Sequence, residues 1–192
     1  MNKKIILASG SPRRKELLEK AGVSFEVVVS EYEEDMTLPL PPDELVKYLS
    51  HEKAETVAKT HTDAIVISAD TIVVYGDIVL GKPHTEERAR EMLRLLSGKQ
   101  HSVFTGFTII LEDEKKTISR AVESKVFFKN LSDEEINEYI ATGEPLEKAG
   151  AYAVQMLGQK FVEKIEGDIP NIIGLPITEV IKELQENFGF IL

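Results

Sequence analysis

The 192-residue sequence contains no cysteine and has no long hydrophobic run near its start. Without cysteine the chain forms no disulfide, uses no thiolate nucleophile and holds no cysteine zinc site, which is compatible with a reducing compartment. The apolar run from Ile5 to Ala8 is too short for a signal peptide or a membrane span. These absences predict a soluble cytoplasmic protein that does not act at a membrane.

Basic charge is also scarce. The chain carries 23 lysines and arginines against 33 aspartates and glutamates, a formal net charge of −10. This excess of acidic residues disfavours sequence-independent binding along a nucleic-acid backbone. A few basic side chains converging on one pocket can still bind a small phosphorylated ligand. With 42% hydrophobic residues and no internal repeat, the length fits a single domain, 1–192, or two closely joined lobes.

Segments of strand length alternate with segments of helical pattern. Strands are expected at 4–8, 23–29, 64–69, 102–111 and 121–130, with a hairpin or strand-turn-strand at 72–80, broken at 75–77, and a further strand inside 154–165. Helices are expected at 13–21, 42–59, 85–96 and 177–188, and another that begins at Ser132 and ends at Gly143. This alternation predicts an α/β fold whose mixed sheet is flanked by helices.

The segment from Ser9 to Arg14, with the sequence SGSPRR, lies where the first strand gives way to a helix. Backbone N–H groups and the positive end of a helix attract an anion there, and an arginine can bind two phosphate oxygens at once. This position therefore indicates a phosphate site. The alternative is an ordinary helix cap with two solvated arginines.

Asp70 and Thr71 follow directly after the β-branched run 64–69. A carboxylate at the end of a strand in an open α/β sheet commonly faces the ligand crevice. There it can hold a divalent cation or accept a proton from water. The alternative is a solvated turn aspartate or a helix cap.

Two lysines and an acidic loop complete the candidate residues. Lys53 and Lys82 can each offset phosphate charge, although a single lysine is more often a surface residue. Glu33, Glu34 and Asp35 could supply a second carboxylate for a magnesium ion near the Asp70 strand, although charge runs usually face water. The 4 histidines show no paired metal-ligand spacing and receive no role.

Taken together, these residues resemble the Maf family of nucleotide pyrophosphatases over almost the whole chain. The ordered motifs that carry the resemblance are SGSPRR at 9–14, SADTIV at 68–73, GKP at 81–83, LSG at 96–98, GEP at 143–145, KAGAY at 148–152 and GLP at 174–176. The resemblance implies a fold similar to that of the inosine triphosphate pyrophosphatases, with two lobes around a nucleotide cleft. Members of the family often form homodimers.

The resemblance also implies an activity, in which a nucleoside triphosphate and water give the monophosphate and pyrophosphate with Mg²⁺, Mn²⁺ or Co²⁺ as cofactor. In this family Asp70 would accept the proton from water. The residues that would contact or neutralise phosphate are Ser9, Arg13, Arg14, Lys53 and Lys82. Glu33 or Glu34 would help Asp70 to hold the metal.

Base selection follows from the branch of the family that this chain resembles most. In that branch a glutamine, here Gln155, follows the alanine-tyrosine stretch, and the substrates are dTTP and UTP. An amide presents both a donor and an acceptor to a pyrimidine edge, and Arg13 and Thr71 complete the specificity set. The departures from the family pattern are Ala153, Met156 and Ile169-Pro170.

Three alternative functions stand beside this one. The first is a pyrophosphatase for modified nucleotides, such as methylated pyrimidine or guanine triphosphates. The second is a non-catalytic regulator of septum formation in cell division, a role long attached to the family. The third is a nucleic-acid-binding module, which the acidic balance of the chain opposes.

Overall fold

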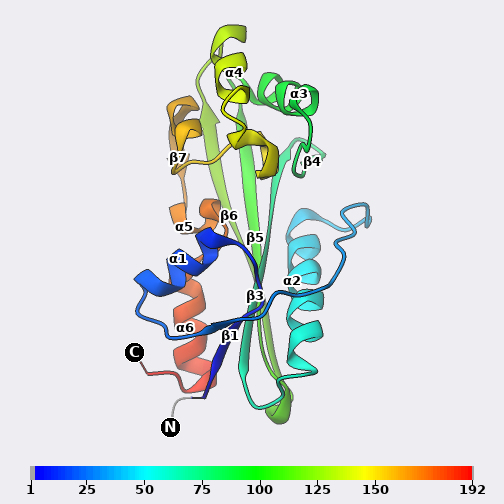
Figure 1. The fold of residues 1–192 in the computed structure, drawn as a ribbon, viewed down its shortest axis with the longest axis vertical. Helices are drawn as coiled ribbons and strands as arrows, with labels where there is room; N and C mark the ends of the chain where they lie inside the picture. The colour runs from blue at the N-terminus through cyan, green and yellow to red at the C-terminus, as the bar shows by residue number, and fades with distance from the viewer. Residues whose placement is uncertain (1–2, 192) are drawn as a thin grey trace. The chain divides into compact units, whose positions relative to one another are not determined.

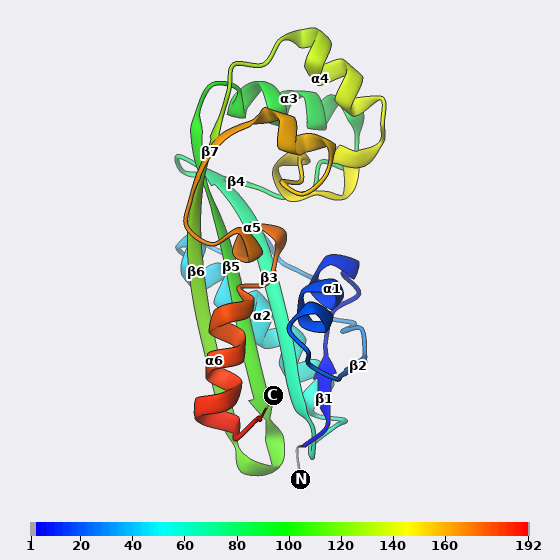
Figure 2. The same ribbon diagram turned by 90° about the vertical axis from the view of Figure 1, so that its left-hand side faces the viewer.

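The computed structural model describes residues 3–191 as a mixed sheet with helices on its faces (Figures 1 and 2). The strands are β1 (Ile5–Leu7), β2 (Glu26–Val27), β3 (Ile65–Tyr75), β4 (Ile78–Leu80), β5 (Gln100–Leu111), β6 (Lys116–Phe128) and β7 (Val162–Glu166). The α-helices are α1 (Pro12–Lys20), α2 (Pro42–Ala58), α3 (Glu86–Leu96), α4 (Asp133–Ile140), α5 (Ile169–Ile173) and α6 (Ile177–Phe188). The 3-10 turns are η1 (Glu112–Glu114), η2 (Glu144–Glu147), η3 (Ala149–Ala151) and η4 (Leu157–Phe161).

The strand order of the sheet is β2-β1-β3-β5-β6-β7, and β4 pairs with β3 outside this path. β1 pairs in parallel with β2 and with β3, whereas β4 on β3 and β7 on β6 are antiparallel. The predicted α/β class, with a mixed sheet flanked by helices, is confirmed. Among the helices of residues 3–191, none has both the length and the apolar character that crossing a bilayer requires.

The chain forms two compact units. Unit 1 comprises the chain through Asp70, residues 105–122 and the chain from Gly174 onward, and unit 2 comprises residues 71–104 and 123–173. Three of the four boundaries fall inside the three longest strands, β3, β5 and β6, and the fourth falls between α5 and α6.

In unit 1 the alternation of side chains along the strands separates two apolar layers. Ile65, Ile67 and Ala69 of β3 belong to the layer that α1 and α6 cover. Val66 of β3 belongs to the layer that α2 covers. Figures 1 and 2 show α2 and α6 on opposite faces of the sheet. Because side chains alternate along a strand, Ser68 and Asp70 share the face of Val66, toward α2.

In unit 2 the helices α3 and α4 pack side by side. Both begin where the sequence predicts. Thr85 accepts a hydrogen bond from the backbone N–H of Arg88, and Ser132 forms a capping box with Glu135. A buried aromatic group of His101, Phe128 and Tyr152 with edge-on ring contacts lies in the core of this unit.

Several element bounds differ from those predicted. β2 spans only Glu26–Val27, because its two residues are exposed and pair with β1 alone at an edge of the sheet. The strand predicted inside 154–165 is β7, which begins at Val162 directly after the turn η4. The helix expected to run to Gly143 ends at Ile140, where α4 gives way to turns.

The sequence predicts that Asp70 follows the end of a strand, and this prediction is wrong. Asp70 lies inside β3. The strand continues to Tyr75 because Ile72, Val73 and Val74 resume the buried apolar run after Asp70 and Thr71.

Candidate active site

The start of α1 gathers hydroxyl and guanidinium groups. Ser9 is 8% exposed, and its Oγ accepts hydrogen bonds from the backbone N–H of Ser11 (3.3 Å) and from Arg14 Nη1 (3.0 Å). Arg14 Nε also donates to the carbonyl oxygen of Gly174 (2.8 Å). The Ser11 hydroxyl makes no capping hydrogen bond to the first turn of α1. This end of the helix therefore has the form of an anion site.

Both arginines are partly withdrawn from water. Burial lowers the pKa of Arg13 from its ordinary value. Burial also lowers the pKa of Arg14, while the carboxylates of Asp70 and Glu34 act in the opposite direction. An arginine pKa starts so high that both side chains keep their charge at neutral pH. Two cations and two carboxylates thus act on one another within unit 1.

Lys53, near the middle of α2, pairs with two carboxylates. Its Nζ lies 2.5 Å from Asp70 Oδ1 and 2.5 Å from Glu34 Oε1. The pair with Asp70 is buried, since the two residues are 8% and 4% exposed, whereas the Glu34 side chain is 45% exposed. Removing either partner of a buried ion pair leaves an uncompensated charge in the interior, which is strongly destabilising.

The second carboxylate oxygen of Asp70 is buried and has no hydrogen-bond partner within the described residues. An unsatisfied buried oxygen beside a second carboxylate fits a hard divalent cation, which prefers oxygen ligands. Of the two glutamates predicted for this role, Glu34 reaches Lys53, while Glu33 is exposed next to it. Asp70 and Glu34, which meet at the Lys53 ammonium group, are therefore the carboxylates that fit the metal that the sequence predicts.

The loop that carries Glu34 is anchored to α2 at a second point. Burial, followed by a hydrogen bond with Tyr48 of α2, raises the pKa of Tyr32 to about 12. Asp35, also in the acidic run, folds back on its own loop, where Oδ1 accepts hydrogen bonds from the backbone and hydroxyl of Thr37. The loop thus lies along α2 with Glu34 directed at Lys53.

Farther along α2, the side chains of His51, Glu52 and Glu55 also approach within metal-ligand distance of one another. These three residues are only partly buried, and Glu55 already accepts a hydrogen bond from Lys59 (2.8 Å). Exposed acidic groups of this kind are common without a metal.

The other predicted site residues, Thr71, Lys82 and Gln155, belong to unit 2. Lys82 is exposed, and its Nζ lies 3.5 Å from Glu147. The loop before it is held by the backbone N–H of Gly150, which donates to the carbonyl oxygen of Gly81 (3.1 Å). Gly150 has a φ of 66°, and a Cβ there would press on Val73.

Gln155 is exposed at the start of a segment whose backbone is clamped. Glu144 accepts hydrogen bonds from the backbone N–H groups of Leu157 (3.2 Å) and Gly158 (3.3 Å) and from the hydroxyl of Tyr139 (2.7 Å). On the other side of Gln155, Tyr152 is buried, and its hydroxyl lies 2.7 Å from Nε2 of His101. The glutamine is therefore presented on a segment held at both ends.

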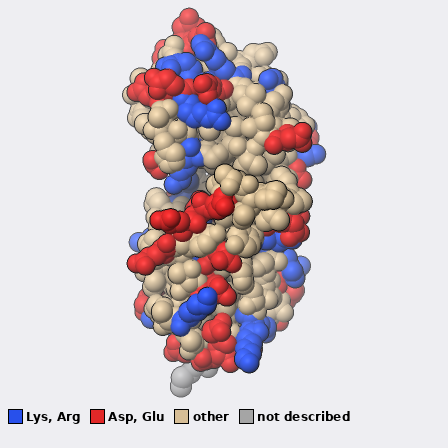
Figure 3. Space-filling model, turned by 90° about the vertical axis from the view of Figure 1, so that its right-hand side faces the viewer, with Lys and Arg blue, Asp and Glu red and all other residues tan. Residues whose placement is uncertain are grey.

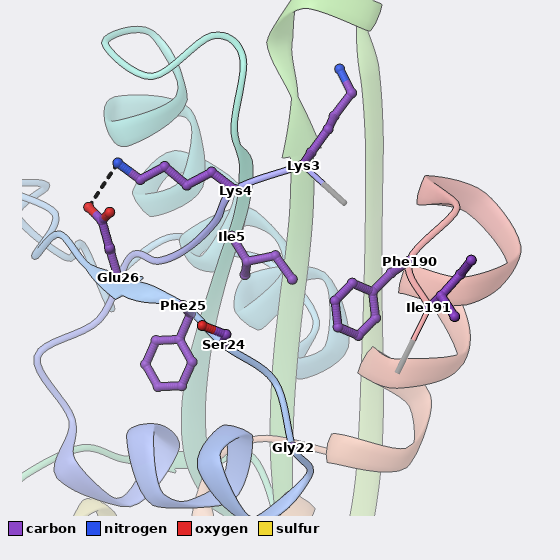
Figure 4. Close-up of a pocket in the computed structure, with 9 residues that line it drawn as sticks. All are labelled: Lys3, Lys4, Ile5, Gly22, Ser24, Phe25, Glu26, Phe190 and Ile191. Carbon is purple, nitrogen blue, oxygen red and sulfur yellow. Dashed lines mark ion pairs between the residues drawn. The ribbon is translucent and has the colours of Figure 1, made fainter. Parts of the chain in front are cut away.

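A cavity of about 370 Å³ opens in unit 1 between the start of β1 and the C-terminal segment (Figure 4). Phe25 and Phe190 line it, together with Lys3 and Lys4. Both lysines are paired with carboxylates, Lys3 with Glu114 and Lys4 with Glu26. The cavity lies by the start of β1, whereas Ser9 follows the end of that strand, so it is not part of the cluster around Asp70.

The face of the molecule drawn in Figure 3 shows acidic and basic side chains interspersed.

The structure also shows polar residues next to Lys53 and Asp70 that received no role from the sequence. Ser50, Ser68 and Thr108 are fully buried between α2 and the sheet. The sequence holds one signal for the two serines, which is their spacing: Ser68 is two residues before Asp70, and Ser50 is one turn before Lys53.

Fold and site together define an α/β protein with a buried lysine–carboxylate pair beside a phosphate-type helix start. The family model described as Maf-like protein matches residues 4–187, and the chain belongs to the Maf family. A relative from Bacillus cereus strain ATCC 10987, named dTTP/UTP pyrophosphatase, is 52% identical over 96% of this chain and 90% of its own length. A relative of the same name from Bacillus cereus strain ZK / E33L is 51% identical over 96% of this chain and 95% of its own.

Among solved structures, the Staphylococcus aureus Ham1 protein aligns with a TM-score of 0.44 and 13% identity, over 96% of this chain and 90% of that chain.

Proposed function

We propose that this protein is a nucleoside triphosphate pyrophosphatase that converts dTTP and UTP to the monophosphate and pyrophosphate. The observation that carries the proposal is the buried Asp70 carboxylate, held by Lys53 and acted on by Arg14. The names of the relatives, which match nearly the whole chain, support the same substrates.

The residues of unit 1 have two different roles in the proposed reaction, proton transfer and phosphate binding. Lys53 fixes one oxygen of Asp70, and the carboxylate of Asp70 accepts a proton from the attacking water. Ser9, Arg13 and Arg14, at the start of α1, bind the phosphate chain and offset its charge. Fixed cations of this kind stabilise charge as it develops on the departing pyrophosphate.

Asp70, Glu34 and Glu33 would hold the divalent metal, Mg²⁺, Mn²⁺ or Co²⁺. When bound, the metal supplies Lewis-acid stabilisation of phosphate oxygens. The part played by this chain is to place two carboxylates around one ammonium group at the site.

Residues of unit 2 supply the remaining contacts of the proposal. Lys82 offsets phosphate charge, and Gln155 meets the pyrimidine edge with its amide, aided by Arg13 and Thr71. We propose that the enzyme acts in the cytoplasm as a homodimer, with both units of residues 1–192 serving one function.

The test is product analysis with a panel of canonical and methylated nucleoside triphosphates, with Mg²⁺ or Mn²⁺ and with chelator. We expect metal-dependent release of pyrophosphate from dTTP and UTP, abolished by the chelator. In ¹⁸O-labelled water the label is expected in the monophosphate, because the water attacks the α-phosphorus.

Three results would contradict the proposal at different points. Release of orthophosphate would move the attack to the γ-phosphate. Turnover of methylated nucleotides alone would keep the reaction but exclude dTTP and UTP. Absence of turnover across the panel would remove the enzymatic function.

A further inference from the structure

Two neighbouring contacts join helix α2 to strand β3. Ser68 and Asp70 are two residues apart in β3 and therefore point to the same face of the strand. Ser50 and Lys53 are three apart in α2 and share a face of the helix. Ser68 contacts Ser50, and Asp70 contacts Lys53. The serine contact and the ion pair are thus neighbouring cross-connections between one helix and one strand.

The serine contact is part of a chain of hydrogen bonds in the interior. The Ser68 hydroxyl donates to the backbone carbonyl oxygen of Ser50. The Ser50 hydroxyl donates to the carbonyl oxygen of Lys47 (2.9 Å) and lies 2.8 Å from Thr108 Oγ1, which lies 2.8 Å from Ser119 Oγ. Since a hydroxyl has one proton, Thr108 must donate to Ser50, and Ser119 to Thr108. Every member therefore has a defined direction.

The neighbouring strand β5 meets α2 without an intervening side chain. A Cβ added at Gly106 would overlap the carbonyl group of Val46 and the backbone nitrogen of Lys47. The helix backbone therefore rests directly on the sheet one turn before Ser50. Interiors are close-packed, so a contact of this kind leaves α2 no room to move closer.

We propose that Ser68 is a positioning residue, which with Gly106 sets the separation of α2 and β3 at which Lys53 reaches Asp70. Gly106 limits how closely the helix approaches, and the Ser68 hydroxyl holds it at that limit. The consequence for catalysis rests on the proposed function, because there the Lys53–Asp70 pair orients the proton acceptor.

The Ser68→Ala change should leave the protein folded. As an interior residue of α2, Ser50 keeps the helical hydrogen bond to its carbonyl oxygen, so no buried acceptor is left without a partner. Ser119→Ala is the matched control, because it removes a hydroxyl from the same chain without touching α2. Thermal unfolding followed by circular dichroism verifies that each variant is folded at the assay temperature.

The first measurement uses nuclear magnetic resonance on the full chain labelled with ¹⁵N-lysine, without nucleotide or metal. A buried, paired ammonium group exchanges its protons slowly, and the signal of Lys53 is assigned by its loss in Lys53→Met. We expect Ser68→Ala to speed this exchange about tenfold or more, and Ser119→Ala to leave it unchanged. An unchanged exchange rate of the Lys53 ammonium protons in folded Ser68→Ala would overturn the proposal.

The second measurement is a double-mutant cycle on dTTP turnover. Ser68→Ala should lower kcat with little change in KM, and this loss should disappear in the Lys53→Met background. A loss of the same size in both backgrounds would show that Ser68 acts independently of Lys53, against the proposal.

The two measurements separate this inference from the proposed function. Suppose that Ser68→Ala speeds the exchange of the Lys53 ammonium protons but the unchanged protein has no pyrophosphatase activity. This result would keep the positioning role of Ser68 and exclude the proposed enzymatic function. Should Ser68→Ala not fold, Ser68→Cys takes its place, with a side chain of similar size and a weaker donor.

Discussion

The two carboxylate oxygens of Asp70 are unlike each other. One is paired with Lys53, and the other is buried without a partner among the described residues. Asp70→Asn keeps the size of the side chain but replaces the carboxylate by a neutral amide, which is too weak a base to accept a proton from water. We expect kcat for dTTP to fall by roughly two to four orders of magnitude, the usual contribution of general-base catalysis. Steady-state pyrophosphate release measures the loss.

Asp63→Asn is the control for this substitution, because Asp63 is an exposed aspartate of the same unit. Its turnover should equal that of the unchanged protein. Turnover close to normal in a folded Asp70→Asn variant would exclude Asp70 as the proton acceptor.

His101 makes the stability of the protein depend on pH. Burial lowers its pKa from 6.5 to about 4, so the folded state resists protonation that the unfolded state accepts. The free energy of unfolding should therefore fall as pH drops below about 6.5 and level off near pH 4, by up to about 3 kcal/mol. Denaturant titrations of the unchanged protein and of His101→Gln, which does not titrate, measure the difference. Parallel pH profiles for the two proteins would contradict this assignment.

At the scale of elements, Glu144 holds the segment that follows Gln155. Glu144→Ala removes the acceptor for the backbone N–H groups of Leu157 and Gly158. We expect hydrogen exchange at these two amides to become faster by about tenfold or more, because each loses its partner. Glu138→Ala, at an exposed glutamate of α4, should leave both rates unchanged. Unaltered exchange at Leu157 and Gly158 in Glu144→Ala would show that other contacts hold the segment.

The helices with strong local signals were predicted well from the sequence. α3 begins after Thr85 and α4 after Ser132, where a side-chain cap determines the first turn. The strand through Asp70 was predicted to end too early, since a charged residue in an apolar run resembles a strand end. The pairing of that carboxylate with Lys53, from a distant helix, makes it compatible with the interior.

Several of the residues assigned to phosphate and metal lie together in unit 1, as the contacts among Ser9, Arg14, Lys53, Asp70 and Glu34 show. Their roles, like those of Arg13, Glu33, Thr71, Lys82 and Gln155, stay predictions. Ser50 and Ser68 were not predicted, because their spacing from Lys53 and Asp70 does not distinguish a buried serine bonded across an interface from an exposed one.

At the scale of the whole molecule, the excess of acidic residues bears on its partners. With a net charge of −10, the protein should not bind single-stranded or duplex RNA at physiological ionic strength. Fluorescence anisotropy with labelled RNA should show no binding at micromolar protein concentration. Tight binding that weakens steeply with added salt would restore the nucleic-acid function.

The backbone contact between α2 and Gly106 has a consequence for how the protein could change under selection. Any side chain at this position would displace the helix that carries Lys53, so few mutations there are neutral. In contrast, Gln155, Met156 and Leu157 are exposed, and their substitution disturbs little packing. With Gln155 meeting the base as proposed, a library selected for new bases should accumulate changes at 155–157, while Gly106 is retained.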